Sequence, residues 1–307
     1  MKNIAFHKTR LLTMAILVVV ISLPSVSMVR ASGNLLRGFD VPATTPFNDD
    51  TIYWPVGVAF DGTNLWYSQP SNITADIFLT TTTGHLLRTL NVINQAGALA
   101  WDGTYLWVGI FANNVNSATC VPGVTGCALL YQVDVHKNKV VKTVDISPIF
   151  AADQECNFIS GLAYDGFTGS LWVAPNVGCG FVFTDNPCGI GFVYNVDTSG
   201  HLLKRIQEPF GVFGVSRVGS HLYMVTCKTL PTQTGRPIIK TNLNGTPVSN
   251  FTTVSVSGNR ESAESIAFDS NTFGNACALW VNQNYGIPFD ASLAAYKIPC
   301  PQNDQEP

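Results

Sequence analysis

Carboxylates and amides are the side chains of this sequence that could act on or hold a ligand. Glu155, Glu264, Glu261 and Asp50 are candidates for catalysis, because two carboxylates flanking one bond can serve as acid and as base or nucleophile. A wider polar set is expected to bind a ligand: Asp50, Trp54, Asn94, Gln95, Glu155, Asn157, Lys228, Glu264, Asn282 and Asn284. No CxxC pair occurs and no histidine lies near two cysteines, so we expect neither a metal nor a cofactor.

A pattern that occurs five times predicts the elements that position these residues. Its copies begin at a small residue and continue through an apolar stretch, a turn and a Leu-aromatic pair: GVAFDGTNLW, ALAWDGTYLW, GLAYDGFTGSLW, GVSRVGSHLY and SIAFDSNTFGNACALW, from Gly57, Ala98, Gly161, Gly214 and Ser265. Repeats of about 40–50 residues, each rich in short strands, are typical of a β-propeller.

Each copy is interpreted as four strands, A to D, because apolar and polar residues alternate between turn signals. The fifth copy has no strand D after SLAAYKI, whereas the segment NLLRGFDVP at 34–42 closely resembles the strand D sequence HLLRTLNV. We therefore predict an all-β fold, a five-bladed β-propeller closed by an N-terminal outer strand that completes the last blade. Such closure removes an open sheet edge.

The chain is divided into a leader, one domain and a tail. Residues 1–31 have the basic start, the apolar run and the small residues of a signal peptide, although an uncleaved anchor is the alternative. Residues 32–300 form the propeller, and 301–307 are expected to be disordered. The predicted blades are 50–93, 94–148, 157–208, 209–256, and 262–300 with 34–42.

Strand direction alternates within a blade, so the D–A and B–C loops share one face, which we call the mouth. The A–B and C–D turns share the opposite face, called the turn face. All candidate ligand-binding residues fall at the mouth, where the loops of a rigid scaffold usually hold ligand-binding groups. The repeated Asp61, Asp102, Asp165 and Asp269 fall at the turn face, and we interpret them as turn residues and not as a cation site.

The eight cysteines are expected to form disulfides in an exported chain. Spacing favours the pairs Cys120–Cys127 and Cys179–Cys188. Cys277 and Cys300 begin strand B and end strand C of the last blade, so they should meet at the turn face. Cys156 and Cys227 could pair with each other, or exchange with Cys179 or Cys188.

Charge limits the partners. The formal net charge is −3, and it would become more negative on loss of the leader, because the charged residues of the leader are all basic. This disfavours nucleic acid and anionic lipid. A small molecule, a glycan or an extracellular protein is the expected partner, with no membrane span after signal cleavage, and the expected location is secreted or periplasmic.

The repeat pattern resembles the NHL/YVTN type of propeller repeat, which also occurs in the streptogramin-lyase-like family. That resemblance covers nearly the whole mature chain and implies the fold, while such propellers include binders, scaffolds and several enzymes. Streptogramin lyases use a histidine at the mouth. The five histidines here lie in the leader or in turns, so the resemblance is to the repeat without the catalytic histidine.

Three functions remain open at this point. The first is a non-catalytic propeller that binds a ligand, glycan or protein at the mouth. The second is an enzyme, either glycosidase-like or similar to plant-type glutaminyl cyclase, whose Phe-x-x-Gly-Leu segment the residues from Phe158 to Leu162 resemble. That likeness implies Glu155 and Lys228 as the polar pair to test. The third is a structural envelope or matrix protein in which the mouth is unused.

Overall fold

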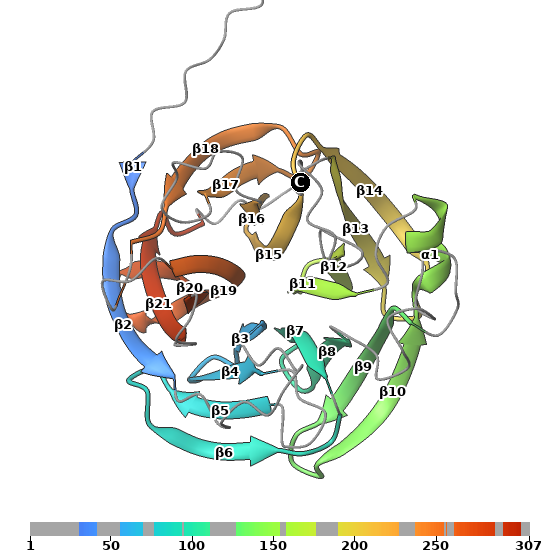
Figure 1. Cartoon of the computed structure of the whole chain (residues 1–307), viewed down its shortest axis with the longest axis horizontal. Helices are drawn as coiled ribbons and strands as arrows, with labels where there is room; N and C mark the ends of the chain where they lie inside the picture. Colours follow the sequence, from blue (N-terminus) through green and yellow to red (C-terminus); the bar gives the residue numbers. More distant parts are fainter. Residues whose placement is uncertain are drawn as a thin grey trace, which may run out of the picture.

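The computed structural model describes residues 31–41, 56–69, 77–93, 95–110, 127–153, 158–175, 190–226, 237–254, 256, 261–285 and 291–301. Five antiparallel sheets stand in a ring, each with its first strand near the centre and its last at the rim (Figure 1). The predicted five-bladed β-propeller is confirmed. The inner strands are buried along nearly their whole length, as β8 (Leu106–Ile110) and β12 (Ser170–Pro175) show, because each sheet packs against a neighbour on both faces.

The blades follow one another along the chain. Blade one contains β3 (Val58–Phe60), β4 (Asn64–Ser68), β5 (Ile77–Thr81) and β6 (Leu86–Leu90). Blade two contains β7 (Ala96–Trp101), β8 (Leu106–Ile110), β9 (Leu129–Asp134) and β10 (Lys139–Asp145). Blade three contains β11 (Ile159–Asp165), β12 (Ser170–Pro175), β13 (Gly191–Asp197) and β14 (Leu202–Glu208).

Blade four contains β15 (Val212–Val218), β16 (His221–Thr226), β17 (Pro237–Asn242) and β18 (Pro247–Thr252). Beside β18, the short β1 (Ala31–Ser32) adds a parallel fifth strand. Blade five contains β19 (Glu261–Phe273), β20 (Ala276–Tyr285), β21 (Ala291–Ile298) and β2 (Leu35–Val41).

The N-terminal strand β2 closes the ring. It pairs antiparallel with β21, from Leu35 opposite Tyr296 to Val41 opposite Ala291. The backbone N–H of Lys297 donates to the carbonyl of Asn34 at 2.8 Å, which matches the bond that closes the C–D turn of blade one, between Thr81 and His85 at 2.9 Å. The N-terminal and C-terminal segments therefore form together, in blade five, the hydrogen bond that closes a continuous C–D turn in blade one.

Five apolar clusters fill the seams, by which we mean the contact zones between adjacent blades. A strand B aromatic lies in each seam; Trp107 and Trp280 are fully buried. Large flat side chains fill the wedge-shaped space between two twisted sheets. This explains the repeated Leu-aromatic pair as packing.

The repeated aspartates hold the A–B turns, as predicted. In blade one, Oδ1 of Asp61 accepts hydrogen bonds from the backbone N–H groups of Thr63 and Asn64, at 3.0 and 2.7 Å. Its Oδ2 accepts the indole N–H of Trp66 at 3.1 Å. The same indole bond joins Asp102 to Trp107, Asp165 to Trp172 and Asp269 to Trp280. One carboxylate thus ties the turn to the tryptophan of the seam.

A short helix was not predicted. α1 (Ser147–Ala152) lies between blades two and three, with a proline in its first turn and Phe150 buried. A helix of six residues leaves little periodic signal in a sequence. Within the part of the chain that is described, no helix is long and apolar enough to cross a membrane.

Candidate functional site

The mouth ends of the innermost strands approach one another closely. A Cβ atom on Gly161 would lie 2.7 Å from the carbonyl oxygen of Phe213 in the next blade, and one on Gly214 would lie 2.8 Å from the carbonyl oxygen of Glu264. Only a residue without a side chain fits at these two places. The small residue that opens each repeat therefore allows the inner strands to converge around the axis.

A β-bulge precedes this small residue in three of the blades. The register shifts between Ile159 and Gly161, between Val212 and Gly214, and between Ala263 and Ser265. The bulged residues are Ser160, Phe213 and Glu264. Bulges often re-aim a side chain beside a functional site. The same backbone feature thus presents a different side chain in each of these blades, and in blade five it is a carboxylate.

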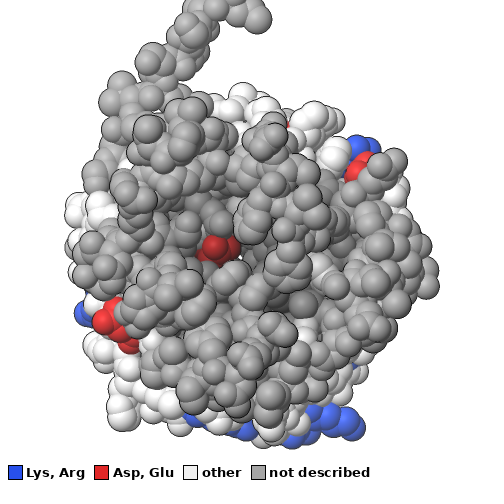
Figure 2. Space-filling view, in the orientation of Figure 1, with Lys and Arg blue, Asp and Glu red and all other residues white. Residues whose placement is uncertain are grey.

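Glu264 is the acid with a described side chain in the mouth half of the inner strands. Three acids whose side chains are described lie on those strands, and two of them, Asp165 and Asp269, are buried in turn-face hydrogen bonds. Glu264 is half-buried and lies in the mouth half of β19. Figure 2 shows acidic atoms at the centre of the ring. Glu264, which the sequence analysis selected, therefore lies on an inner strand at the close approach of blades four and five.

Beside Glu264, the seam between blades five and one contains buried polar groups that lack partners. Ser265 lies opposite Asn282 in the β19–β20 pairing, and both side chains are fully buried. Neither the Ser265 hydroxyl nor either end of the Asn282 amide has a hydrogen-bond partner in the described structure. Desolvated polar groups without partners are costly, so each native example calls for an explanation.

Tyr67 belongs to the same seam. It packs in the apolar cluster that also contains Trp280 and Ala291, and only 1% of it is exposed. Its hydroxyl has no partner among the described atoms, and burial raises the pKa of the phenol, which stays protonated. A hydroxyl donor is thus added to the polar groups of this seam.

Equivalent positions elsewhere at the mouth are satisfied. In blade one, Ser68 accepts the backbone N–H of Gly57 at 2.8 Å and donates to the carbonyl of Gly97. In blade five, the amide of Gln283 donates to the carbonyl of Val254 and to the hydroxyl of Tyr296, both at 3.2 Å. The position of Asn282 is therefore satisfied in blade one by Ser68, whereas in blade five it is left without a described partner.

The structure tests few of the other predicted site residues. Gln95 is buried and has a positive φ of 59°, and the backbone of Asn284 pairs with Ala291. Outside the described residues lie Asp50, Trp54, Asn94, Glu155, Asn157 and Lys228. Their convergence on Glu264 stays a prediction.

One predicted disulfide is confirmed. Cys277 and Cys300 are bonded, with their Cα atoms 5.0 Å apart, at the turn face where the ring closes. Cys127 is also disulfide-bonded. The remaining cysteines lie outside the described residues: Cys120, Cys156, Cys179, Cys188 and Cys227.

Comparisons with known proteins support the fold but assign the chain to no family. A scan of protein-family models and a search of curated proteins found no match. Among solved structures, the chain is similar to a glutaminyl cyclase from Myxococcus xanthus, with a TM-score of 0.52 and 12% identity over 89% of this chain and 100% of that chain. At this identity the likeness concerns the fold alone. The NHL/YVTN resemblance remains a prediction.

Sequence reasoning missed Ser265 and Tyr67 as site residues. Both occupy regular repeat positions, where a hydroxyl is easily interpreted as part of a strand. The available signal was comparison between copies, because Ser265 stands where three other repeats have glycine and one has alanine.

Proposed function

We propose that this protein is an exported propeller that binds a small molecule bearing an amine and an amide at the mouth end of its central channel. The observation that supports this is the group formed by Glu264, Ser265 and Asn282, in which a central carboxylate adjoins buried polar atoms without partners. A ligand that supplies the missing donors and acceptors would offset their desolvation.

The chemistry of these groups favours a particular ligand class. A carboxylate attracts an ammonium group through a charge-assisted hydrogen bond. The primary amide of Asn282 can donate to and accept from a second amide. An amino acid amide or a peptide N-terminus with an amide side chain contains both groups. The predicted leader and the Cys277–Cys300 disulfide support an extracellular location, since disulfides persist in oxidising compartments.

Titration calorimetry with the dipeptide Gln-Ala tests the proposal, and N-acetyl-Gln-Ala is the matched probe without the ammonium group. Gln-Ala should bind, the acetylated form should not, and Glu264→Gln should weaken binding by about tenfold or more, because it removes a charged hydrogen-bond acceptor. Asp40→Asn changes an exposed carboxylate on the outer strand β2 and should bind like the wild type. Equal binding by the Glu264→Gln variant would contradict the proposal.

A second candidate is a glutaminyl-cyclase-like reaction, favoured by the propeller neighbour of that activity. In this reaction the α-amine of an N-terminal glutamine attacks its own side-chain amide carbon. The new C–N bond closes a lactam ring and the old one breaks, so that ammonia leaves. Glu264 could accept the proton from the amine and return it to the departing nitrogen, as a general base and then a general acid.

Mass spectrometry of Gln-Ala after incubation separates the two candidates. The cyclase hypothesis predicts conversion to the pyroglutamyl product with release of ammonia, and loss of this conversion in Glu264→Gln. If Gln-Ala binds but is not converted, the binding proposal stands and the cyclase hypothesis is wrong.

A further inference from the structure

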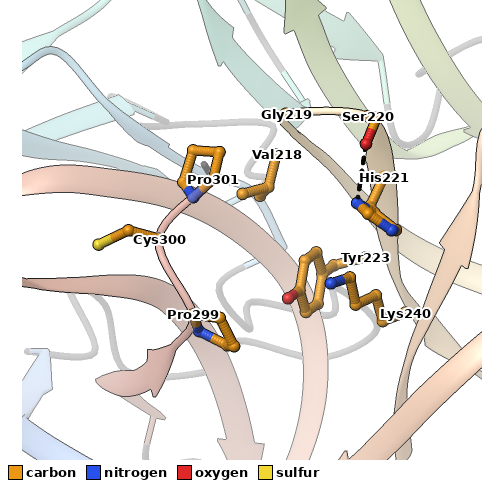
Figure 3. Close-up of a pocket in the computed structure, with 9 residues that line it drawn as sticks. All are labelled: Val218, Gly219, Ser220, His221, Tyr223, Lys240, Pro299, Cys300 and Pro301. Carbon is orange, nitrogen blue, oxygen red and sulfur yellow. Dashed lines mark hydrogen bonds between the residues drawn. The ribbon is translucent and has the colours of Figure 1, made fainter. Parts of the chain in front are cut away.

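Blade four departs from the repeat at the turn face. It has Val218 where the other blades have the turn aspartate, and Tyr223 where they have the seam tryptophan. The indole–carboxylate bond of the other blades therefore cannot form. A cavity of about 230 Å³ lies at this place, in the seam between blades four and five, bounded on the other side by Pro299–Pro301 (Figure 3). Smaller side chains in the degenerate copy account for the open space.

A lysine lines this cavity without a neighbouring turn aspartate, whereas the residue at the equivalent position of blade two is hydrogen-bonded to one. Lys240 lies opposite Tyr223 in the β16–β17 pairing. At the same position of blade two, opposite Trp107, the amide of Gln132 donates to Oδ2 of Asp102 at 3.1 Å. Blade four keeps a strand C donor but has lost the acceptor. The ammonium of Lys240 instead lies 5.8 Å from the centroid of the Tyr223 ring (Figure 3).

The rest of the wall adds hydrogen-bond donors and apolar surface. His221 lines the cavity, and its Nδ1 is 3.2 Å from the Ser220 hydroxyl. Burial raises the pKa of Tyr223 to about 12, so its hydroxyl remains protonated. Val218 and Pro301 provide apolar contacts, and none of the described residues that line the cavity is an aspartate or glutamate. The cavity therefore has positive and donor groups on one side and an apolar surface on the other.

We propose that this cavity binds a small organic carboxylate with a flat apolar body. The ligand carboxylate would take the place of the missing aspartate beside Lys240, and its body would pack against Val218 and Pro301. This site is on the face opposite Glu264 and does not depend on the function proposed for the mouth.

Titration calorimetry with sodium benzoate tests the site, with benzamide as a neutral probe of the same shape. Benzoate should bind and benzamide should not. Lys240→Gln should weaken benzoate binding by about tenfold or more, since it removes a charge-assisted hydrogen bond. Lys139→Gln changes an exposed lysine on the rim of blade two and should leave binding unchanged.

A second variant restores the carboxylate of the repeat. Val218→Asp places a protein carboxylate beside Lys240, and benzoate binding should then be lost while circular dichroism shows a folded protein. If this variant does not fold, Lys240→Gln and the benzamide comparison still decide the question. Equal binding of benzamide, or unchanged benzoate binding in Lys240→Gln, would overturn the proposal. Benzoate binding that appears only after removal of residues 302–307, which include Asp304 and Glu306, would also overturn it. In the full-length protein these residues would then occupy the cavity in place of a ligand.

Discussion

Asp269 and Asn282 lie in the same blade and are both fully buried, yet their surroundings differ. At the turn face, Asp269 accepts two backbone N–H groups, at 2.8 and 2.9 Å, and the indole N–H of Trp280 at 2.8 Å. At the mouth end, neither end of the Asn282 amide has a partner among the described residues. Only the first arrangement recurs in other blades. Repeated polar groups therefore build the fold, whereas the unrepeated ones are where a ligand is to be sought.

Blade four extends this lesson within the turn face. Arg217 takes the position of a strand A aromatic, and its side chain is only 7% exposed. Its Nε is 3.5 Å from Oδ2 of Asp165, and its guanidinium lies 5.3 Å from the centroid of the Phe167 ring. Where the repeat is lost, a buried charge or a cavity takes the place of the indole–carboxylate bond.

Asp165→Asn should have the largest effect on stability. It removes the anion that the structure describes beside the buried Arg217, and an uncompensated buried charge costs about 3–5 kcal/mol. Urea unfolding should show this loss in the free energy of unfolding. Asp61→Asn is the control, because Asp61 also accepts the indole N–H of its seam tryptophan in an A–B turn but forms no ion pair with a described arginine; about 1–2 kcal/mol is expected there. If both variants lose the same free energy of unfolding, the ion pair between Arg217 and Asp165 does not stabilise the protein.

Glu208 should make stability depend on pH, with an effect of intermediate size. Its side chain is 2% exposed at the end of β14, and its Oε1 has no described partner. Burial raises the pKa from 4.5 to about 7. The folded state therefore holds a proton that the unfolded state has lost, and the free energy of unfolding should fall as pH rises from about 4.5 to 7, by about 2–3 kcal/mol.

Urea unfolding across this pH range measures the effect. Glu208→Gln keeps the shape but cannot ionise, so its stability should change less with pH than that of the wild type. Asp40→Asn, which alters an exposed carboxylate, should keep the slope. A wild-type protein that becomes more stable over this interval would be evidence against a raised pKa at Glu208.

Most of the fold could be predicted because its signals are local or repeated. Asp61-Gly62 and its copies indicate the turns, and the segment at 34–42 repeats the strand D sequence closely enough to predict ring closure. Contacts between blades could not be predicted in this way. The Arg217–Asp165 pair joins two copies whose relative placement only the folded ring determines.

The candidate site was predicted in part. Glu264 and Asn282 were identified because polar residues at strand ends must lie at the mouth. Ser265 and Tyr67 were missed, since their importance comes from what they lack in the seam, and a sequence does not show the partners of a buried hydroxyl. The cavity at Val218 could have been found, because the sequence shows that Asp and Trp are lost together in blade four.

Ser265→Ala should have the smallest effect on stability. It directly tests the contrast between buried polar groups with hydrogen-bond partners and those without. It removes a buried hydroxyl without a partner, so the free energy of unfolding should stay unchanged or rise by up to about 1 kcal/mol. Ser68→Ala, in the adjacent blade, leaves the N–H of Gly57 and the carbonyl of Gly97 unpaired and should lose about 1–3 kcal/mol. If the two substitutions cost the same free energy of unfolding, the Ser265 hydroxyl has a partner in the folded protein. It would then not be available to bind a ligand, against the proposal. If Ser265→Ala is neutral for unfolding but weakens Gln-Ala binding, the unpaired hydroxyl serves the ligand and not the fold.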